Sequence, residues 1–198
     1  MRTHPNRKSY LFHVIFGCFF FAAVSLGLVS SSYGQEPTIT DFTVANSEDY
    51  VLLYLTVKDW MTEEMSEAVH NGIPLTFAFS VDLFAEKNNW PDQKVKEYEF
   101  NHVMEYNSLK KEYIVHRNEN GESRVTNSLE EAIRIMSEIN GFKVLPLNEL
   151  DSRTAYNLRA KAQMARKTMP PYFHYLIPFS TPWDFETQWY KLTLKLAP

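Results

Sequence analysis

The sequence predicts a mainly β protein, either an antiparallel β-sandwich or a strongly curled sheet, with two short α-helices. Alternation of apolar and polar residues, typical of half-buried strands, recurs along most of the chain after residue 35. Only two segments keep helical spacing, and most of the strands follow one another directly, which favours antiparallel pairing. An α+β arrangement is the alternative.

Residues 1–34 predict a signal peptide or an N-terminal membrane anchor. Three basic residues precede an apolar run at 10–29 that carries no charge, and small residues follow up to Gly34. This order of basic, apolar and small residues is that of an export signal, with cleavage expected before Gln35. The apolar run of about nineteen residues is also close to the roughly twenty that span a bilayer, so it can instead remain as an anchor. In both cases residues 35–198 are expected to form a single extracytoplasmic, periplasmic domain.

Cysteine and charge content restrict the chemistry and the partners. The single cysteine, Cys18, lies in the apolar run, so the expected domain has no disulfide, thiolate metal site or cysteine nucleophile. Bulky Phe16 disfavours Cys18 as a site of lipid attachment. Without its three N-terminal basic residues the chain has 17 basic and 24 acidic residues, a net charge of −7. Such a domain repels nucleic acid and anionic lipid surfaces, so membrane contact is expected only through an uncleaved N-terminal segment.

The first half of the domain is expected to contain three strands and a helix. Residues 50–57 are apolar on both faces, which predicts a central strand. Thr62 begins a short helix with acidic residues in its first turn, and Asn71-Gly72 ends it. Alternation then predicts strands at 74–84 and 98–106, separated by a turn at 88–92.

The second half begins with a hairpin turn at 118–121, where Asn-Gly tolerates positive φ. Ser128 and Glu131 form a capping-box pattern in which both side chains are expected to bind backbone N–H groups, and Asn140-Gly141 is expected to end this second helix.

Apolar residues predict a strand at 142–150, and alternation predicts another at 156–164. Prolines and aromatic residues in 170–182 exclude a central strand there. The apolar parity changes within the last strand, which predicts a β-bulge near Gln188 or a strand that is apolar on both faces.

No catalytic, metal or cofactor site is predicted. The histidines after residue 35 lack the spacing of a known metal motif, and His102 is expected to pack inside the domain. There is no nucleophile elbow and no glycine loop that could cradle phosphate. Paired carboxylates could cleave a glycosidic bond, but Glu97, Glu99 and Glu105 alternate along one strand and are most simply a solvated face.

Aromatic residues near prolines are the strongest indication of a binding surface. Tryptophan and tyrosine combine a large apolar ring with a polar group, and they are enriched where proteins bind partners. Prolines would order such a segment in advance and so reduce the entropy lost on binding. The alternative is a segment that covers the core as a lid. The candidate binding residues are Trp90, Tyr172, Tyr175, Phe179, Trp183 and Trp189.

Motifs in a fixed order span nearly the whole domain. They comprise residues 51–55, 67–77, 106–109 with 113–115, 128–132, 158–160, and Trp183 with Trp189. This set resembles a secreted bacterial family known as domain of unknown function number 4390. The resemblance implies an exported protein of this size without assigned catalytic residues, in a family often encoded beside a membrane sensor kinase.

The functional expectation is a non-enzymatic binding or interaction module of the bacterial cell envelope, and the resemblance implies that it is accessory to a membrane sensor kinase. Its expected partner is an envelope or membrane protein. Two alternatives are a carrier of an apolar ligand in a sheet cavity and an envelope-glycan-acting enzyme with paired carboxylates. The pattern does not indicate an oligomeric state.

Overall fold

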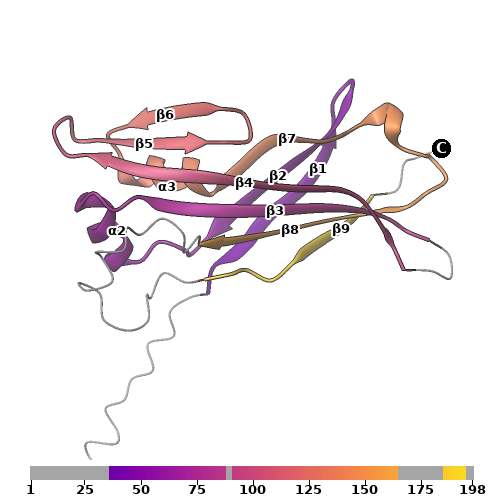
Figure 1. Ribbon diagram of the computed structural model, residues 1–198, viewed down its shortest axis with the longest axis horizontal. Helices are drawn as coiled ribbons and strands as arrows, with labels where there is room; N and C mark the ends of the chain where they lie inside the picture. Colours follow the sequence, from indigo (N-terminus) through magenta and orange to yellow (C-terminus); the bar gives the residue numbers. More distant parts are fainter. Residues whose placement is uncertain (1–35, 88–90, 165–184, 195–198) are drawn as a thin grey trace, which may run out of the picture. The chain divides into compact units, whose positions relative to one another are not determined.

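The computed structural model describes residues 36–87, 91–164 and 185–194 (Figure 1). Two α-helices are present there, α2 (Glu63–His70) and α3 (Leu129–Ser137), with a short 3-10 helix, η1 (Leu147–Glu149). Neither these helices nor any other part of the described ranges forms a helix long and apolar enough to cross a membrane. The strands are β1 (Thr38–Asn46), β2 (Tyr50–Lys58), β3 (Leu75–Ala85), β4 (Gln93–Asn107), β5 (Glu112–Arg117), β6 (Glu122–Thr126), β7 (Glu138–Pro146), β8 (Tyr156–Met164) and β9 (Tyr190–Leu194).

The strands form two antiparallel sheets. The small sheet has the order β1-β2-β7, so β2 is central as predicted. The large sheet has the order β6-β5-β4-β3-β8-β9. All pairings between these strands are antiparallel, which confirms a mainly β protein with two short α-helices.

Alternating side chains of both sheets meet in one hydrophobic core. In β2 the odd-numbered residues from Val51 to Val57 are buried, and in β3 the odd-numbered residues from Leu75 to Leu83 are buried. Burying an aliphatic or aromatic side chain of this size contributes about 1.5–3 kcal/mol. The period-two patterns in the sequence therefore identify the core faces of these two strands.

Helix α2 has the predicted limits. The side chain of Thr62 accepts a hydrogen bond from the Met65 N–H at 3.3 Å, and Gly72 follows the helix with a φ of +84°. The capping-box prediction for α3 is only half correct. The Ser128 hydroxyl accepts from the Glu131 N–H at 3.3 Å, but the Glu131 carboxylate binds Arg134 at 2.7 Å instead of the Ser128 N–H. The Ser128 N–H instead donates to the Thr126 hydroxyl oxygen at 3.2 Å, and the ion pair with Arg134 gives the Glu131 carboxylate two hydrogen bonds.

The predicted end of the second helix is wrong. Helix α3 ends at Ser137, and Asn140-Gly141 lies within β7. Pairing with β2 passes from Tyr54↔Asn140 to Leu53↔Phe142, so Gly141, with a φ of +73°, is the extra residue of a β-bulge. A helix end and a bulge both use glycine at positive φ, so the dipeptide alone does not distinguish them.

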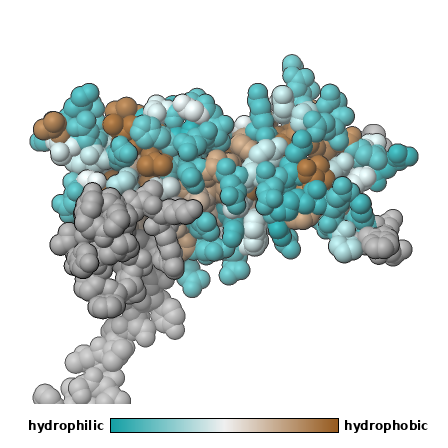
Figure 2. Space-filling view, viewed as in Figure 1, coloured by the Kyte–Doolittle hydropathy of each residue, from teal (hydrophilic) through white to brown (hydrophobic). Residues whose placement is uncertain are grey.

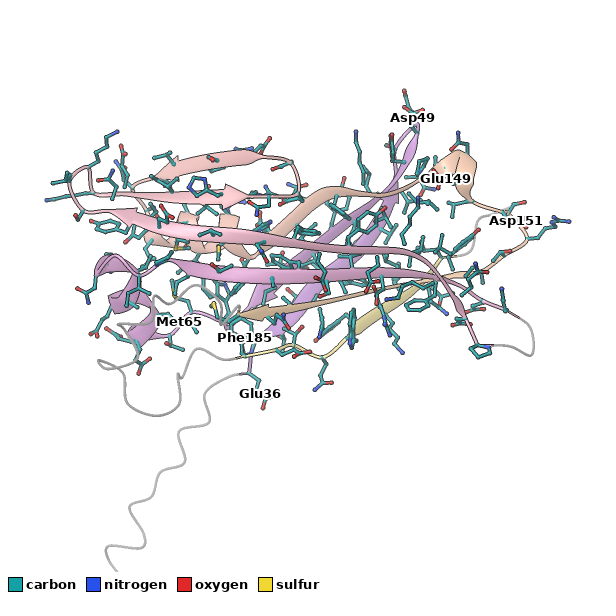
Figure 3. The ribbon with its side chains drawn as sticks, viewed as in Figure 1. Glu36, Asp49, Met65, Glu149, Asp151 and Phe185 are labelled. Carbon is teal, nitrogen blue, oxygen red and sulfur yellow. The ribbon has the colours of Figure 1, made fainter. Side chains whose placement is uncertain are left out.

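The strand predicted at 142–150 is also shifted. It begins earlier, at Glu138, and ends at Pro146, after which the chain forms η1. Proline has no N–H to donate to a sheet, which suits the end of a strand. The Leu147 N–H donates to the Asp49 carbonyl oxygen at 2.8 Å, which places η1 beside the β1–β2 turn (Figure 3).

The bulge predicted near Gln188 is confirmed. Gln163 pairs with Glu186 and Ala160 pairs with Tyr190, so three steps on β8 match four steps on the last strand segment. The buried Thr187 occupies this irregular stretch, and its hydroxyl accepts from the Ala162 N–H at 3.0 Å. The extra residue explains why the apolar parity changes there.

Candidate functional site

One of the six candidate binding residues, Trp189, lies in the part of the chain that the structure describes. It is half-buried directly before β9. The other five lie outside the described residues: Trp90, Tyr172, Tyr175, Phe179 and Trp183.

Trp189 packs against cations on the solvent-facing side of the large sheet. The guanidinium of Arg159 lies 4.3 Å from the centre of the indole ring, and the ammonium of Lys161 lies 5.1 Å from it. The other side of Arg159 contacts Phe84, with 4.5 Å between guanidinium and ring centre. Arg159 is thus held between two aromatic rings, an arrangement that favours a cation.

A buried carboxylate fixes this stack. The side chain of Asp82 is 4% exposed and accepts two hydrogen bonds from Arg159, from Nε at 3.0 Å and from Nη2 at 2.7 Å. Lys94 adds a third cationic contact at 3.4 Å. Because the charges compensate one another, the stack that contains Trp189 is best interpreted as a structural cluster that shields Asp82.

Replacing Trp189 by alanine is expected to lower the free energy of unfolding by about 1–2 kcal/mol, since it removes a cation–π contact and half-buried apolar area. Urea denaturation of the variant and the wild type measures the difference. Lys191→Ala is the matched control, because Lys191 is exposed and pairs with Arg159 on the neighbouring strand. Equal stability of Trp189→Ala and Lys191→Ala would show that the stack contributes nothing.

One groove lies between β4 of the large sheet and β7 of the small sheet. It has a volume of about 580 Å³ and is lined by residues 98–100 of β4, 117–120 of the β5–β6 turn and 139–143 of β7. We call it the β4–β7 groove. Figure 1 shows that β5 and β6 flank only part of β4, and the ring of Tyr98 in the remaining part packs against Phe142 of β7. A volume of this size accommodates a small ligand or a few residues of a peptide.

A buried ion cluster supports one wall of the β4–β7 groove. His102 is fully buried, and its Nε2 lies 3.0 Å from Oε2 of Glu119. Arg117 donates to the other carboxylate oxygen, Oε1, from Nε at 3.0 Å and is 2.9 Å from it through Nη2. His102 Nδ1 is 2.9 Å from the Met136 carbonyl oxygen. The two ring nitrogens of His102 therefore each face an oxygen atom, one of the Met136 carbonyl and one of the Glu119 carboxylate.

The cluster keeps Glu119 ionised. Burial raises the pKa of the Glu119 carboxyl, but the hydrogen bond and charge of His102, a backbone hydrogen bond and the charge of Arg117 outweigh burial and hold the pKa below its ordinary value. An ionised carboxylate with both oxygens engaged fixes the turn that carries it. The wall of the groove is therefore preorganised by an ion pair and by hydrogen bonds that join β4, the β5–β6 turn and the end of α3.

Aromatic rings form the apolar part of the groove. The ring of Phe142 lies 4.8 Å from that of Phe100 and 5.1 Å from that of Tyr98, centre to centre. The Tyr98 hydroxyl donates to the Val144 carbonyl oxygen at 2.5 Å, and burial raises the pKa of this phenol. These contacts hold β4 and β7 together beneath an opening rimmed by Asn, Lys and Glu side chains.

A second groove of about 520 Å³ lies between residues 56–61 and α3. Its Arg134 already binds Glu131 and Glu138, at 2.7 Å each, so charges there are compensated locally. The face visible in Figure 2 is mainly hydrophilic, with hydrophobic residues in small separate groups. Within the described ranges no three histidine, cysteine, aspartate or glutamate side chains could hold a metal ion. The β4–β7 groove is therefore the strongest candidate site.

The sequence did not point to Arg117 or Glu119. It predicted a turn at 118–121 and an inward His102 as separate features. The available signal was indirect, because a buried histidine needs hydrogen-bond partners and a nearby turn can supply them. Glu97, Glu99 and Glu105 are exposed along β4, as the solvated-face interpretation predicted.

Comparison with known families supports the resemblance seen in the sequence. The model of the family described as "Domain of unknown function (DUF4390)" matches residues 34–193. No curated protein and no solved structure matches the chain.

Proposed function

We propose that this chain, which belongs to the family described as "Domain of unknown function (DUF4390)", is an exported, non-enzymatic binding module of the cell envelope. Its partner is an envelope or membrane protein. The resemblance to the family suggests that the chain acts as an accessory protein of a membrane sensor kinase. Because the family description assigns no activity, the geometry of the β4–β7 groove carries the proposal.

The single supporting observation is a groove with a fixed wall and an open mouth. The ion cluster of His102, Glu119 and Arg117 holds the β5–β6 turn in place without any ligand. Aromatic rings at its base and polar side chains at its rim are the usual composition of a binding site. Preorganisation lowers the entropy lost on binding, so such a groove suits recognition.

Export is supported by the N-terminal sequence. Basic residues, an uncharged apolar run and small residues up to Gly34 follow one another in the order of a signal peptide. The absence of cysteine after Cys18 is compatible with an oxidising compartment, because no thiol of the domain can form an unwanted disulfide there.

The alternative functions fit the geometry less well. A carrier of an apolar ligand needs an enclosed apolar cavity, whereas the β4–β7 groove is open and has polar and charged side chains. A glycan-cleaving enzyme needs a protonated acid as proton donor. Glu119 in the groove is poorly suited to that role, because its pKa is lowered and both of its oxygens are engaged.

The proposal predicts site-specific crosslinks in intact cells. A photo-crosslinking amino acid at Asn120 or Asn140, both exposed at the groove, is expected to capture the same envelope protein. The matched control position is Lys191, which is exposed on β9 of the large sheet. Mass spectrometry of the crosslinked bands identifies the partner and its compartment.

Capture of the same proteins from Lys191, or none from either groove position, would contradict a binding role for the groove. The export part is checked separately with a reporter that is active only outside the cytoplasm, fused after residue 198. An inactive fusion of normal abundance would overturn export and with it every envelope partner.

A further inference from the structure

We infer that the β4–β7 groove binds an extended polypeptide segment, which adds to the free edge of β4 as a further strand and alternates apolar with basic residues. The inference rests on the proposed binding function and specifies the chemistry of the partner. Strand addition to an open sheet edge gains affinity from main-chain hydrogen bonds and specificity from alternate side chains.

The first step is that half of β4 lacks a neighbouring strand on one side. β4 pairs with β3 along residues 93–107, but β5 pairs only with residues 102–107. At Arg117 the chain leaves the sheet for the β5–β6 turn. Within the described residues no strand takes the place of β5 beside residues 93–101, and Figure 1 shows β5 and β6 covering only one end of β4. The groove occupies this vacated position.

The backbone groups on that edge can be identified. The Asn118 N–H donates to the Asn101 carbonyl oxygen at 3.1 Å, so the backbone of Asn101 faces the side of β5. Backbone direction alternates along a strand, so Glu99 and Glu97 face the same way. Neither has a backbone partner on that side among the described residues. A new strand would satisfy their N–H and C=O groups.

β4 is a better template than β7, the other strand that borders the groove. The pairing of β7 with β2 shifts at Gly141 and again at Val144, so its edge is irregular. The Val144 carbonyl oxygen is already bound by the Tyr98 hydroxyl. In contrast, β4 keeps unbroken register with β3 from Lys96 to Asn101, which gives a regular edge of six residues.

The side chains beside this edge define the partner. Tyr98 and Phe100 point to the inner side, where Phe142 packs on both, so an added strand would place apolar side chains there. Glu97 and Glu99 are exposed on the outer side; Lys94 already pairs with Glu97 at 2.8 Å, so Glu99 is the main acidic position. Opposite charges on facing positions of neighbouring strands attract, so the partner would carry lysine or arginine at the alternate positions. The acidic balance after the N-terminal segment, 17 basic against 24 acidic residues, also favours a cationic partner.

A phage-displayed library of random linear peptides, panned against the purified domain, tests the inference. Glu99→Pro serves for counter-selection, because proline removes the N–H that faces the open edge and leaves the ladder with β3 intact. The selected peptides are expected to alternate apolar and basic residues, and synthetic copies are expected to bind Glu99→Pro at least about 10-fold more weakly. Thermal unfolding verifies that this variant is folded.

A charge reversal provides a second variant that does not depend on proline. Glu99→Lys is expected to weaken the basic peptides, and copies with glutamate in place of lysine are expected to regain binding to it. In wild-type protein, the amide hydrogens of Glu97 and Glu99 are expected to exchange at least about 10-fold more slowly when peptide is bound, as measured by NMR.

Each contrary result has a distinct meaning. Selected peptides that lack alternation, equal binding to Glu99→Pro, or no selected peptide at all would overturn strand addition. A further contrary result is that peptides shift the NMR signals of Asn140 and Phe142 but leave the amides of Glu97 and Glu99 unprotected. This result would support the groove as a binding site and overturn the inference of an added strand. Concentration-dependent dimers that protect these amides would replace the partner by a second copy. Peptide addition to β4 without crosslinks from either Asn120 or Asn140 in cells would instead contradict the proposed envelope function.

Discussion

Replacing Glu119 by alanine is expected to lower the free energy of unfolding by about 3–5 kcal/mol, the usual cost of removing one partner from a buried ion pair. The Glu119 side chain is 4% exposed and that of Arg117 is 10% exposed, while His102 is fully buried. Without the carboxylate, the Arg117 guanidinium would lose its ion-pair partner and the His102 Nε2 would lose its hydrogen-bond partner, with little solvent to replace either. The loss of a buried carboxylate that pairs with Arg117 is therefore far more costly than the loss of a surface charge.

Chemical denaturation of three variants tests this expectation. Glu119→Gln keeps the shape and one acceptor oxygen, so a smaller loss is expected than for Glu119→Ala. Glu99→Ala lies at the same groove but is exposed, and it is expected to change stability by less than about 0.5 kcal/mol. If Glu119→Ala is no less stable than Glu99→Ala, the ion cluster does not hold the wall of the groove.

The same cluster gives stability a definite dependence on pH. The pKa of Glu119 is lower in the folded protein than its reference value of 4.5. A lowered folded pKa means that the carboxylate stabilises the fold at pH values above 4.5, and that this contribution is lost as the pH falls through the folded pKa. Wild-type protein is therefore expected to lose more stability between pH 7 and pH 3 than Glu119→Gln, and parallel curves would show that Glu119 is not responsible.

Most strands could be predicted from the sequence because their signal is local. Alternation in residues 74–84, 98–106 and 156–164 directly reports a buried and an exposed face, and each became a strand of the large sheet. The bulge near Gln188 was also visible, because an extra residue exchanges the two faces. Alternation and a bulge both depend on residues that are close together in the sequence, so a local pattern can reveal them.

The errors arise where one local signal has two structural meanings. Asn140-Gly141 was interpreted as a helix end, but the glycine serves a bulge in β7 because both use positive φ. Glu131 fits a capping box, yet Arg134 three residues later binds its carboxylate. In both cases the sequence pattern fits two structures. The one that forms depends on a competing partner or backbone conformation that the pattern does not show.

The groove could not be predicted because it depends on contacts between distant parts of the chain. His102, Glu119 and the Met136 carbonyl come from a strand, a turn and a helix, and β7 reaches the groove only after α3. The point at which β5 leaves β4 is likewise a property of sheet topology. Periodicity identifies which face of a strand is buried, but it does not identify which edge stays open.

Replacing Phe77 by alanine is expected to lower the free energy of unfolding by about 3–5 kcal/mol, as for large-to-small changes in other protein cores. Phe77 is fully buried in β3, and its ring lies 4.4 Å from that of Trp60, 5.9 Å from that of Phe79 and 5.3 Å from that of Phe185. Its removal would leave a cavity that links the end of β2, the middle of the large sheet and the segment before β9. These surroundings come from separate elements, so they cannot collapse together to fill it.

Thermal and urea denaturation measure this loss, and Leu109→Ala is the matched control. Leu109 is 95% exposed in the β4–β5 turn, so the same kind of truncation there is expected to change stability by less than about 0.5 kcal/mol. Phe77→Leu is expected to fall between the two, because it retains most of the buried volume. Should Phe77→Ala cost no more than Leu109→Ala, the three ring contacts cannot be present in solution. Because Phe77 lies outside the β4–β7 groove, the folded fraction of this variant is expected to keep the peptide affinity of the wild type.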